Sequence, residues 1–310
     1  MEISPTIVIL LSTYNGANYL EEQLDSLLRQ TYDDFIIVVR DDGSTDSTQQ
    51  IINRYMNKNQ NKIYKLPGKQ INIGPSASFS NLIQYIMNEK GTFGLDRLYI
   101  MLCDQDDIWL KNKLEVQISK MLYAEQKSIG RPILIHSDLN VVDEGKKLIA
   151  KSFIKYQGLE IRRNQFTNLV LSNLVTGCTI LFNEELAYEA LPIPDKAIMH
   201  DWWLALTASA FGEIIFIDIP LVKYRQHANN TIGAQEFAAT KLSTEAIRLR
   251  LFTSKRNSHL VDVAEQAIEF QKRFGKSLDL KQNLCLRISS LMTHSLVGIQ
   301  RIFYRIARAL

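Results

Sequence analysis

TIVILLSTYNG, residues 6–16, is the most informative stretch of this 310-residue chain. Its first six residues form a continuous apolar run rich in β-branched side chains, and polar residues and a glycine follow at once. Such a run predicts a short strand that is buried on both faces, as the strands of a parallel sheet are. Asn18, with Glu21 three residues later, predicts the N-cap of a helix that follows this strand.

The alternation of strand and helix continues over roughly the first 120 residues. Further strands are expected at residues 35–39, 62–66 and 98–102, and helices near residues 51–55 and at 78–87. This rhythm predicts an α/β fold with a mostly parallel sheet and helices on both faces. Four shorter strands are expected to extend the same sheet into a mixed one, at residues 132–136, 179–182, 213–218 and 221–224.

Composition excludes several classes of protein. The net charge is only +3, from 36 Lys and Arg against 33 Asp and Glu, which argues against a generic nucleic-acid-binding protein. Cys103, Cys178 and Cys285 form neither a disulfide framework nor a CxxC metal motif, and they favour a reducing cytoplasm. No signal-peptide pattern and no run of about 18 apolar residues occurs, so a spanning helix is not expected.

Polar residues follow three of the predicted strands. Thr13, Tyr14 and Asn15 follow the first strand, Asp41 and Asp42 follow the second, and the segment 104–107 follows the fourth. In an open α/β sheet, ligands bind at the carboxyl ends of the strands, so these side chains are expected to meet in one site. Asp-Gly-Ser alone is also a common turn, but a carboxylate there can accept hydrogen bonds from a nucleobase or a ribose.

The segment Asp104-Gln105-Asp106-Asp107 places three carboxylates within four residues. Carboxylate oxygens suit Mg²⁺ or Mn²⁺, and the diphosphate of a ligand can fill the remaining coordination positions. The alternative interpretation is the acidic N-terminus of a helix that begins near Trp109. Neither GxGxxG nor GxxxxGK[ST] occurs, so the sequence lacks the fingerprints of a dinucleotide-binding fold and of a P-loop.

Two later segments add candidate residues. His200-Asp201-Trp202-Trp203 places a carboxylate beside two tryptophans, where burial can raise its pKa and suit it to act as a base. The alternative is an N-cap aspartate over core aromatics. In the segment at residues 224–231, Arg225 can bind phosphate and His227 can bind a metal or a diphosphate, although a lone histidine is more often structural.

Together these segments resemble a family 2 glycosyltransferase of the GT-A fold, a Rossmann-like mixed sheet flanked by helices. The resemblance covers residues 6–233, and the motifs at 12–16, 41–46 and 104–107 have the family's order and spacing. Five other segments resemble the bacterial rhamnosyltransferase-like branch, which typically uses dTDP-L-rhamnose to build surface polysaccharides: 72–74, 136–138, 176–178, 200–203 and 224–227.

The resemblance implies a role for each matching residue. Asp201 would be the catalytic base of an inverting transfer, and Asp106 and His227 would hold Mn²⁺ or Mg²⁺. The nucleotide-sugar would contact the residues of the strand ends and one arginine: Thr13, Tyr14, Asn15, Asp41, Asp42, Asp104, Gln105 and Arg225. The donor or acceptor pocket would include Asp107, Trp109, Gly177, His200, Trp202 and Trp203. Because Asp107 adds an acid to the family's Asp-X-Asp motif, the identity of the metal ligand stays open.

The resemblance also predicts the organisation of the chain and its partners. Residues 1–235 would form the catalytic domain, with a nucleotide-sugar half at 1–120 and an acceptor half at 121–235, and residues 236–310 a basic helical extension. The donor would be a nucleotide-diphosphate sugar, and the acceptor a glycan or a lipid-linked molecule. The last helix could lie on the inner face of an anionic membrane; the alternative is packing on the core or in a homodimer interface.

Two other functions stay open at this point. A nucleotidyltransferase also combines a nucleotide site with a carboxylate-bound metal, but residues 12–16 lack the glycine-rich, basic loop typical of that class. A non-catalytic subunit that binds sugar-nucleotides is the second alternative, and the presence of Asp104, Asp106 and Asp201 argues against it.

Overall fold

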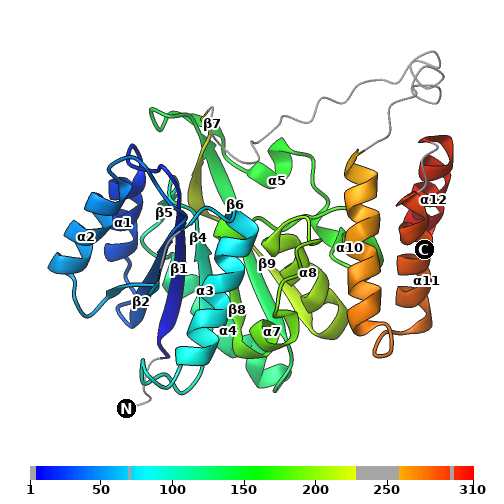
Figure 1. The fold of residues 1–310 in the computed structure, drawn as a ribbon, viewed down its shortest axis with the longest axis horizontal. Coiled ribbons are helices and arrows are strands. Elements are labelled where there is room, and N and C mark those ends of the chain that lie inside the picture. The colour runs from blue at the N-terminus through cyan, green and yellow to red at the C-terminus, as the bar shows by residue number, and fades with distance from the viewer. Residues whose placement is uncertain (1–4, 69–70, 228–257, 294–296) are drawn as a thin grey trace.

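The computed structural model describes residues 5–68, 71–227, 258–293 and 297–310. They form one mixed sheet with helices on both faces, and the N-terminal helices and C-terminal helices lie at opposite ends of the molecule (Figure 1). The strand order is β3-β2-β1-β4-β8-β6-β9-β5, with β7 paired to β6. The GT-A-like α/β fold expected from the sequence is therefore present.

The first half of the sheet is parallel. Its strands are β1 (Ile7–Thr13), β2 (Phe35–Asp41), β3 (Ile63–Lys65) and β4 (Tyr99–Cys103). The helices between them are α1 (Leu20–Leu28), α2 (Thr48–Lys58) and α3 (Pro75–Glu89). Alternate residues of β1 enter two different cores: Ile7 and Ile9 pack with α1 and α2, while Val8 and Leu10 pack with α3. This two-sided burial explains why the strand sequence is apolar without alternation.

The second half of the sheet mixes strand directions. It contains β5 (Ile108–Trp109), β6 (Ile133–Val142), β7 (Leu148–Ala150), β8 (Ile180–Asn183) and β9 (Glu213–Arg225). Its helices are α4 (Lys113–Lys127), α5 (Phe153–Tyr156), η1 (Ile161–Arg163), α6 (Phe166–Leu169), η2 (Gly177–Thr179), α7 (Glu184–Ala190) and α8 (His200–Phe211). Strand β8 is antiparallel to both β4 and β6, whereas β6 and β9 are parallel.

Three local predictions were wrong. Asn18 does not cap α1: the N-cap is Tyr19, and no side chain caps that helix. The two strands expected at 213–218 and 221–224 are one strand, β9, whose register against β6 shifts near Asp138. Trp109 does not begin a helix, because residues 108–109 pair with β9 as β5 and the helix starts at Lys113.

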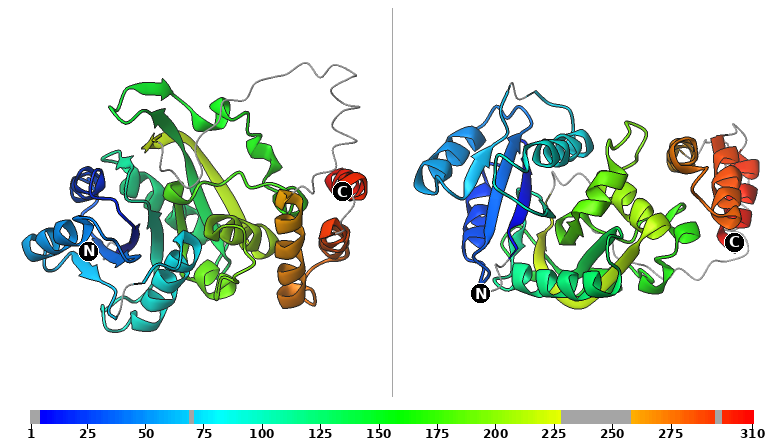
Figure 2. Two further views of the ribbon diagram at one scale, coloured as in Figure 1. Left: turned by 45° about the horizontal axis from the view of Figure 1, so that its top comes forward. Right: turned by 90° about the horizontal axis from the view of Figure 1, so that it is seen from below.

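The C-terminal part contains α10 (Ser258–Phe274), α11 (Leu280–Ser290), η3 (Leu291–Thr293) and α12 (Val297–Ala309). Phe270 and Phe274 of α10 lie 5.1 and 6.2 Å from Trp203, measured between ring centroids, so α10 packs on the hydrophobic core beside α8. In both views of Figure 2, α11 and α12 lie together on the far side of α10. The part of the helical extension predicted between residues 236 and 257 lies outside the described residues.

Helix α12 turns only part of its apolar side chains inward, since Phe303 packs on the core. Gln300 and Ala307 are buried, while Ile302 and Ile306 are 56% and 45% exposed. Among the helices of the described ranges, none is both long enough and apolar enough to cross a membrane.

Candidate active site

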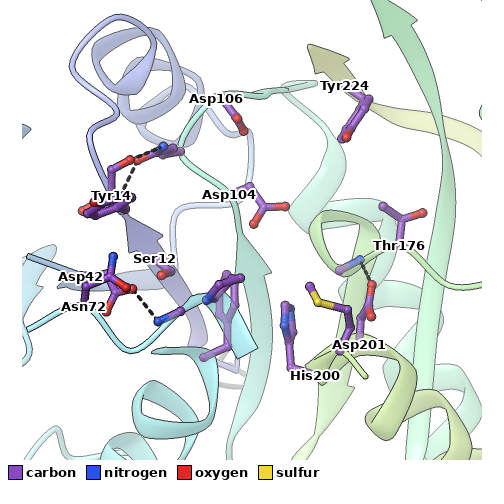
Figure 3. A pocket seen from close by; sticks show the side chains of 17 residues that line it. Ser12, Tyr14, Asp42, Asn72, Asp104, Asp106, Thr176, His200, Asp201 and Tyr224 are labelled. Carbon is purple, nitrogen blue, oxygen red and sulfur yellow. Dashed lines mark hydrogen bonds between the residues drawn. The ribbon is translucent and has the colours of Figure 1, made fainter. Parts of the chain in front are cut away.

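A cavity of about 430 Å³ lies where β1, β2 and β4 end. Figure 3 shows Tyr14 and Asp42 on one side, Thr176 and Asp201 on the opposite side, and Asp104 between them. Its lining comprises Ser12, Thr13, Tyr14, Asp42, Asn72, Gly74, Pro75, Phe79, Asp104, Gln105, Asp106, Thr176, Gly177, Met199, His200, Asp201 and Tyr224. The structure thus brings residues from the ends of β1, β2 and β4 together with the 200–201 segment.

The loop after β1 is fixed to the acidic segment by two reciprocal hydrogen bonds. The Tyr14 N–H donates to Oε1 of Gln105 over 2.8 Å, and Nε2 of Gln105 donates to the Tyr14 carbonyl over 2.9 Å. The Tyr14 ring is 47% exposed and lines the cavity. Asn15 lies outside the lining at a φ of 47°, and its Oδ1 accepts from the Thr45 N–H over 2.8 Å. Gln105 and Asn15 therefore shape the loop, and Tyr14 presents a flat ring to a ligand.

Asp41 lies below the cavity and does not line it. Its Oδ1 accepts from the hydroxyls of Thr13 and Ser44 over 3.0 and 2.5 Å. Its Oδ2 accepts from the Ser44 N–H over 3.0 Å and from Nε2 of Gln49 over 2.9 Å. With four hydrogen bonds and no exposed surface, this carboxylate holds the turn after β2. Of the two aspartates predicted to contact the nucleotide, the structure therefore keeps Asp41 out of the lining.

Asp42 lines the cavity and organises its wall. Its Oδ1 accepts from Nη1 of Arg40 over 2.5 Å and from the Ile73 N–H over 2.8 Å, and its Oδ2 accepts from the Gly74 N–H over 2.9 Å. Gly74 has a φ of +82°, a conformation that an L side chain rarely adopts. This ion pair and the two backbone hydrogen bonds fix the loop that precedes α3 against the end of β2.

The three acids after β4 divide into two groups. Asp104 and Asp106 line the cavity, whereas Asp107 is fully buried beneath it. Withdrawal from water and the carboxylates of Asp106 and Asp201 raise the pKa of Asp104 to about 7. Burial, and then Asp106 and Asp104, raise the pKa of Asp107 well above its usual range. The acids repel one another, and a divalent cation would relieve that repulsion.

The residues present fit a hard divalent cation. Oδ2 of Asp107 is buried and has no hydrogen-bond partner among the described residues, which marks an uncompensated acceptor beside Asp104. Ligand atoms of Asp104, Asp107 and Cys178 lie within 4.8 Å of one another. Burial raises the pKa of the Cys178 thiol well above its usual range, and a soft sulfur suits Mn²⁺ and Mg²⁺ less than carboxylate oxygens do. The carboxylates remain as the ligands that Mn²⁺ and Mg²⁺ prefer.

His227 reaches the acidic segment from the end of β9. Its Nε2 lies 2.8 Å from Oδ2 of Asp106, and its ring stacks on Tyr19 with centroids 4.7 Å apart. The His227 side chain is only 5% exposed. The structure thus brings together the two residues predicted to hold the metal.

Arg225 does not line the cavity. Its Nε donates to the Asp106 carbonyl and its Nη1 to the Glu144 carbonyl, both over 2.9 Å, and its Nη2 donates to Glu22 over 2.5 Å. The Arg225 backbone N–H also donates to Asp107 over 3.2 Å. These contacts hold the acidic segment in place. The structure therefore places Arg225 outside the lining, with its guanidinium engaged by the acidic segment, Glu144 and Glu22.

Asp201 lies in the first turn of α8. Its Oδ2 accepts from the Gly177 N–H over 3.0 Å, and its Oδ1 accepts from Nδ2 of Asn173 over 3.3 Å. Burial raises the pKa of Asp201 to about 6, even though three backbone hydrogen bonds favour its charged form. A carboxyl group with this pKa is largely ionised at neutral pH and still a better proton acceptor than an exposed aspartate.

His200 also faces the cavity and packs at 4.3 Å on the ring of Phe79. Burial lowers its pKa to about 3, so the imidazole is neutral. Its Nδ1 has no hydrogen-bond partner among the described residues. A Cβ placed on Gly177 would come within 3.1 Å of Nε2 of His200, so the glycine keeps this wall open.

The predicted tryptophans belong to the core and not to the pocket. Trp109 is 2% exposed, and the indole N–H groups of Trp202 and Trp203 donate to the carbonyls of Leu169 and Ala190 over 2.5 and 2.9 Å. The tryptophans that follow Asp201 anchor its helix in the core, because the side chains after Asp201 turn away from the cavity with the helical period.

Sequence reasoning missed eight residues of the lining: Ser12, Asn72, Gly74, Pro75, Phe79, Thr176, Met199 and Tyr224. Four of them, Asn72, Gly74, Thr176 and Tyr224, lie in segments that resemble the rhamnosyltransferase branch. That resemblance could have identified these four as lining residues. Phe79 has the spacing of a core residue of α3, and nothing in the sequence distinguishes it from its buried neighbours.

Comparisons with known proteins place the chain among glycosyltransferases. The model of the family described as "Glycosyl transferase family 2" matches residues 8–186. A dTDP-rhamnosyl transferase, RfbG, of Shigella flexneri is 28% identical over 72% of this chain and 74% of its own length. An uncharacterized glycosyltransferase, RP339, of Rickettsia prowazekii (strain Madrid E) is 28% identical over 74% of this chain and 66% of its own length.

Solved structures show the same fold. S. aureus TarS 1-349 in complex with UDP-GlcNAc superposes with a TM-score of 0.54 at 19% identity, over 99% of this chain and 88% of TarS. The mannosyltransferase PcManGT from Pyrobaculum calidifontis, in complex with GDP-Man and Mn²⁺, gives a TM-score of 0.52 at 14% identity, over 99% of this chain and 78% of that one. Because the family model covers more than half of the 310 residues, the chain belongs to glycosyl transferase family 2, and it is a glycosyltransferase with a sugar-nucleotide donor.

Proposed function

We propose that this protein is an inverting, metal-dependent glycosyltransferase that moves L-rhamnose from dTDP-L-rhamnose to a hydroxyl of a glycan or lipid-linked acceptor. The observation that supports the reaction is the single cavity in which the acids after β4 face Asp201. Its volume of about 430 Å³ lies within the range of small-molecule sites.

The donor would span the cavity from the loop after β1 to the acidic segment. The Tyr14 ring offers a stacking surface for the base, and Asp42 and Asp104 offer acceptors for N–H groups of the base and hydroxyls of the sugar. Asp106 and His227 would hold Mn²⁺ or Mg²⁺ against the diphosphate. When bound, the cation supplies positive charge that stabilises the departing diphosphate.

Asp201 would act as the base. As the acceptor oxygen forms its bond to C1 of the sugar, a carboxylate oxygen of Asp201 takes the hydroxyl proton. The bond between C1 and the diphosphate breaks on the opposite face, and its electron pair leaves with the diphosphate. The N–H of Gly177 and the amide of Asn173 orient the carboxylate for this step.

Rhamnose as the sugar is supported by two observations. The Shigella flexneri relative is named a dTDP-rhamnosyl transferase. In addition, Phe79 and Met199 form an apolar part of the lining beside His200, which suits the methyl group of a 6-deoxy sugar.

A membrane surface is part of the proposal because α11, η3 and α12 expose apolar and basic side chains together. Five apolar side chains are at least 45% exposed: Leu280, Leu284, Leu291, Ile302 and Ile306. Residues 280–310 contain five Lys and Arg and no Asp or Glu. Exposed apolar groups with basic neighbours favour an anionic lipid surface, where a lipid-linked acceptor would lie.

The decisive experiment measures release of nucleoside diphosphate from a panel of nucleotide-sugars, with Mn²⁺ or with excess EDTA. Metal-dependent release from dTDP-rhamnose above all other donors is the expected result. Release from another donor would correct the sugar, and equal release in EDTA would remove the metal from the proposal. A nucleotidyltransferase would instead consume a nucleoside triphosphate and a sugar phosphate, and a non-catalytic subunit would bind a donor without releasing diphosphate.

A further inference from the structure

A second cavity, of about 350 Å³, lies between the segment that leads into β8 and the C-terminal helix α12. The segment contributes Glu160, Arg163, Asn168, Ser172 and Asn173, and α12 contributes Tyr304 and Arg308. The two walls are therefore more than 100 residues apart in the sequence, and they meet only in the folded chain. The proposed donor chemistry uses none of these side chains except Asn173.

Asn173 connects this cavity to the active site. It lines the second cavity, and its Nδ2 donates to Oδ1 of Asp201 over 3.3 Å and to the Val175 carbonyl over 2.8 Å. Its Oδ1 accepts from the Val175 N–H over 3.0 Å, which fixes the amide. A molecule in the second cavity would therefore lie one side chain away from the proposed base.

The charge of the second cavity favours an anion. Arg163 and Arg308 line it from opposite walls, and Glu160 is its one acid. Glu160 pairs with Nε of Arg163 over 3.0 Å, and both side chains stay exposed, by 68% and 43%, so the pair is weak. Arg308 has no ion-pair partner within the described ranges of the chain. Arginine forks match phosphate oxygens in geometry, and the amide of Asn168 adds a donor.

Apolar groups complete the cavity. Leu171 and Leu174 are 4% and 6% exposed, and they line it together with Tyr304. The site therefore combines cations at its rim with an apolar wall, which suits a molecule that carries both a phosphate and a sugar face or a hydrocarbon chain.

We propose that this second cavity binds the phosphate or diphosphate group of the acceptor and so places the acceptor hydroxyl at Asp201. The inference rests on the proposed transferase function, and it names the acceptor class as a phosphorylated or diphosphorylated sugar carrier. The group can belong to a lipid diphosphate or to a free sugar phosphate, since both present the same oxygens to the two arginines.

The test uses inorganic pyrophosphate as the probe, in titration calorimetry on the full chain with excess EDTA. Without a divalent cation, binding of diphosphate at the donor site is suppressed, so the second cavity dominates the signal. We expect Arg163→Gln and Arg308→Gln each to weaken binding by about tenfold, because each removes charge-assisted hydrogen bonds. Arg162→Gln and Arg305→Gln are matched controls, since both residues are exposed on the same elements but do not line the cavity.

Each outcome decides the inference. Unchanged pyrophosphate affinity in the Arg163→Gln/Arg308→Gln double variant would overturn it, and so would an equal loss in the control variants, which would indicate general surface charge. Farnesyl diphosphate and phosphatidylglycerol vesicles distinguish the sources: stronger binding of farnesyl diphosphate than of pyrophosphate indicates a lipid diphosphate, and equal binding indicates a free sugar phosphate. An arginine effect on vesicles alone would assign the site to phospholipid headgroups and end the acceptor interpretation.

A separate readout distinguishes this inference from the proposed function. With Mn²⁺ and no acceptor, the double variant is expected to release nucleoside diphosphate from the donor at the wild-type rate. If the wild-type protein releases diphosphate from no donor while the arginines still bind pyrophosphate, the transferase proposal fails and the anion site stands. If nucleoside diphosphate is released normally but the arginine substitutions leave pyrophosphate affinity unchanged, only the acceptor inference fails.

Discussion

Nε2 of His227 lies 2.8 Å from Oδ2 of Asp106, although 121 positions separate the two residues in the chain. Strand β9 makes this possible, because it pairs with β5 directly after the acidic segment and ends beside the carboxylates. The contact joins the two residues that the sequence nominated for a metal.

Asp106→Asn is expected to remove most of the metal-dependent gain in nucleotide affinity. Wild-type protein should bind dTDP more tightly in Mn²⁺ than in EDTA, and the variant should lose about tenfold or more of that gain, because a carboxylate ligand and its charge are missing. Titration calorimetry in both conditions measures the difference. His227→Ala should act in the same direction, and unchanged Mn²⁺ dependence in both variants would place the metal elsewhere.

Asp201→Asn is expected to abolish transfer while it preserves donor binding. The amide keeps nearly the same volume and one acceptor oxygen for the Gly177 N–H, but it cannot take a proton. Loss of a positioned base costs roughly 10²–10⁴-fold in rate. Single-turnover transfer and donor affinity should be measured on the same preparation. Wild-type transfer by the variant would refute the base assignment.

The raised pKa of Asp201 also predicts a stability effect. Its pKa is about 6 in the folded chain and near 3.8 when unfolded, so the folded state binds more protons between these values. The free energy of unfolding therefore falls as the pH rises from about 3.8 to about 6, because ionising this buried carboxyl group is costly in the folded state. The Tm of Asp201→Asn should exceed the wild-type Tm at pH 7, and the two Tm values should be similar near pH 4. Thermal denaturation at both pH values tests the sign, and a lower Tm at pH 7 would contradict it.

Gly177→Ala tests the packing between the base and its neighbour. The new methyl group would lie 3.1 Å from Nε2 of His200, so that side chain must shift by a few tenths of an ångström beside Asp201, whose Cβ would lie at an ordinary contact distance of 3.6 Å. Small displacements of catalytic groups cost up to about 10²-fold in rate, so kcat should fall while nucleotide affinity changes little. Gly91→Ala is the control, because nothing lies within 4 Å of its added Cβ. Equal kcat in both variants would show that His200 can shift to accommodate the methyl group without affecting the reaction.

Ile302→Glu/Ile306→Glu tests the proposed membrane surface. Two charges on the exposed face of α12 should abolish sedimentation with phosphatidylglycerol vesicles, because they remove apolar insertion and repel anionic lipid. Ile129→Glu is the control, since Ile129 is 87% exposed and follows α4, remote in sequence from α12. Vesicle binding that survives the double change, or fails in the wild type, would refute the membrane contact.

The sequence predicted the sheet and the centre of the site because both depend on local pattern. The apolar run of β1 specifies a strand covered on both faces, and carboxylates at strand ends meet wherever parallel strands end together. Asp104 and Asp106 could be named on this basis, whereas Asp201 was named from the tryptophans that follow it and from the family resemblance.

The directions in which individual side chains point could not be predicted from local pattern. Arg225 was expected on the ligand, but its partners Glu22 and Glu144 come from distant parts of the chain that no local pattern connects to it. Trp202 and Trp203 follow the base in sequence, yet the helical period turns them into the core. Phe79 joined the lining only because α3 approaches the first residue of α8, His200.

The reversed direction of β8 has a consequence for how such proteins diversify. Because β8 runs against β4, its first residues, and not its last, reach the edge where the acids lie. The segment between α5 and β8 thus supplies Gly177 and Asn173, while in the proposed reaction the loops after β1, β2 and β4 supply the donor side. Insertions or replacements in that one loop could give a descendant a new acceptor while the nucleotide site is inherited unchanged.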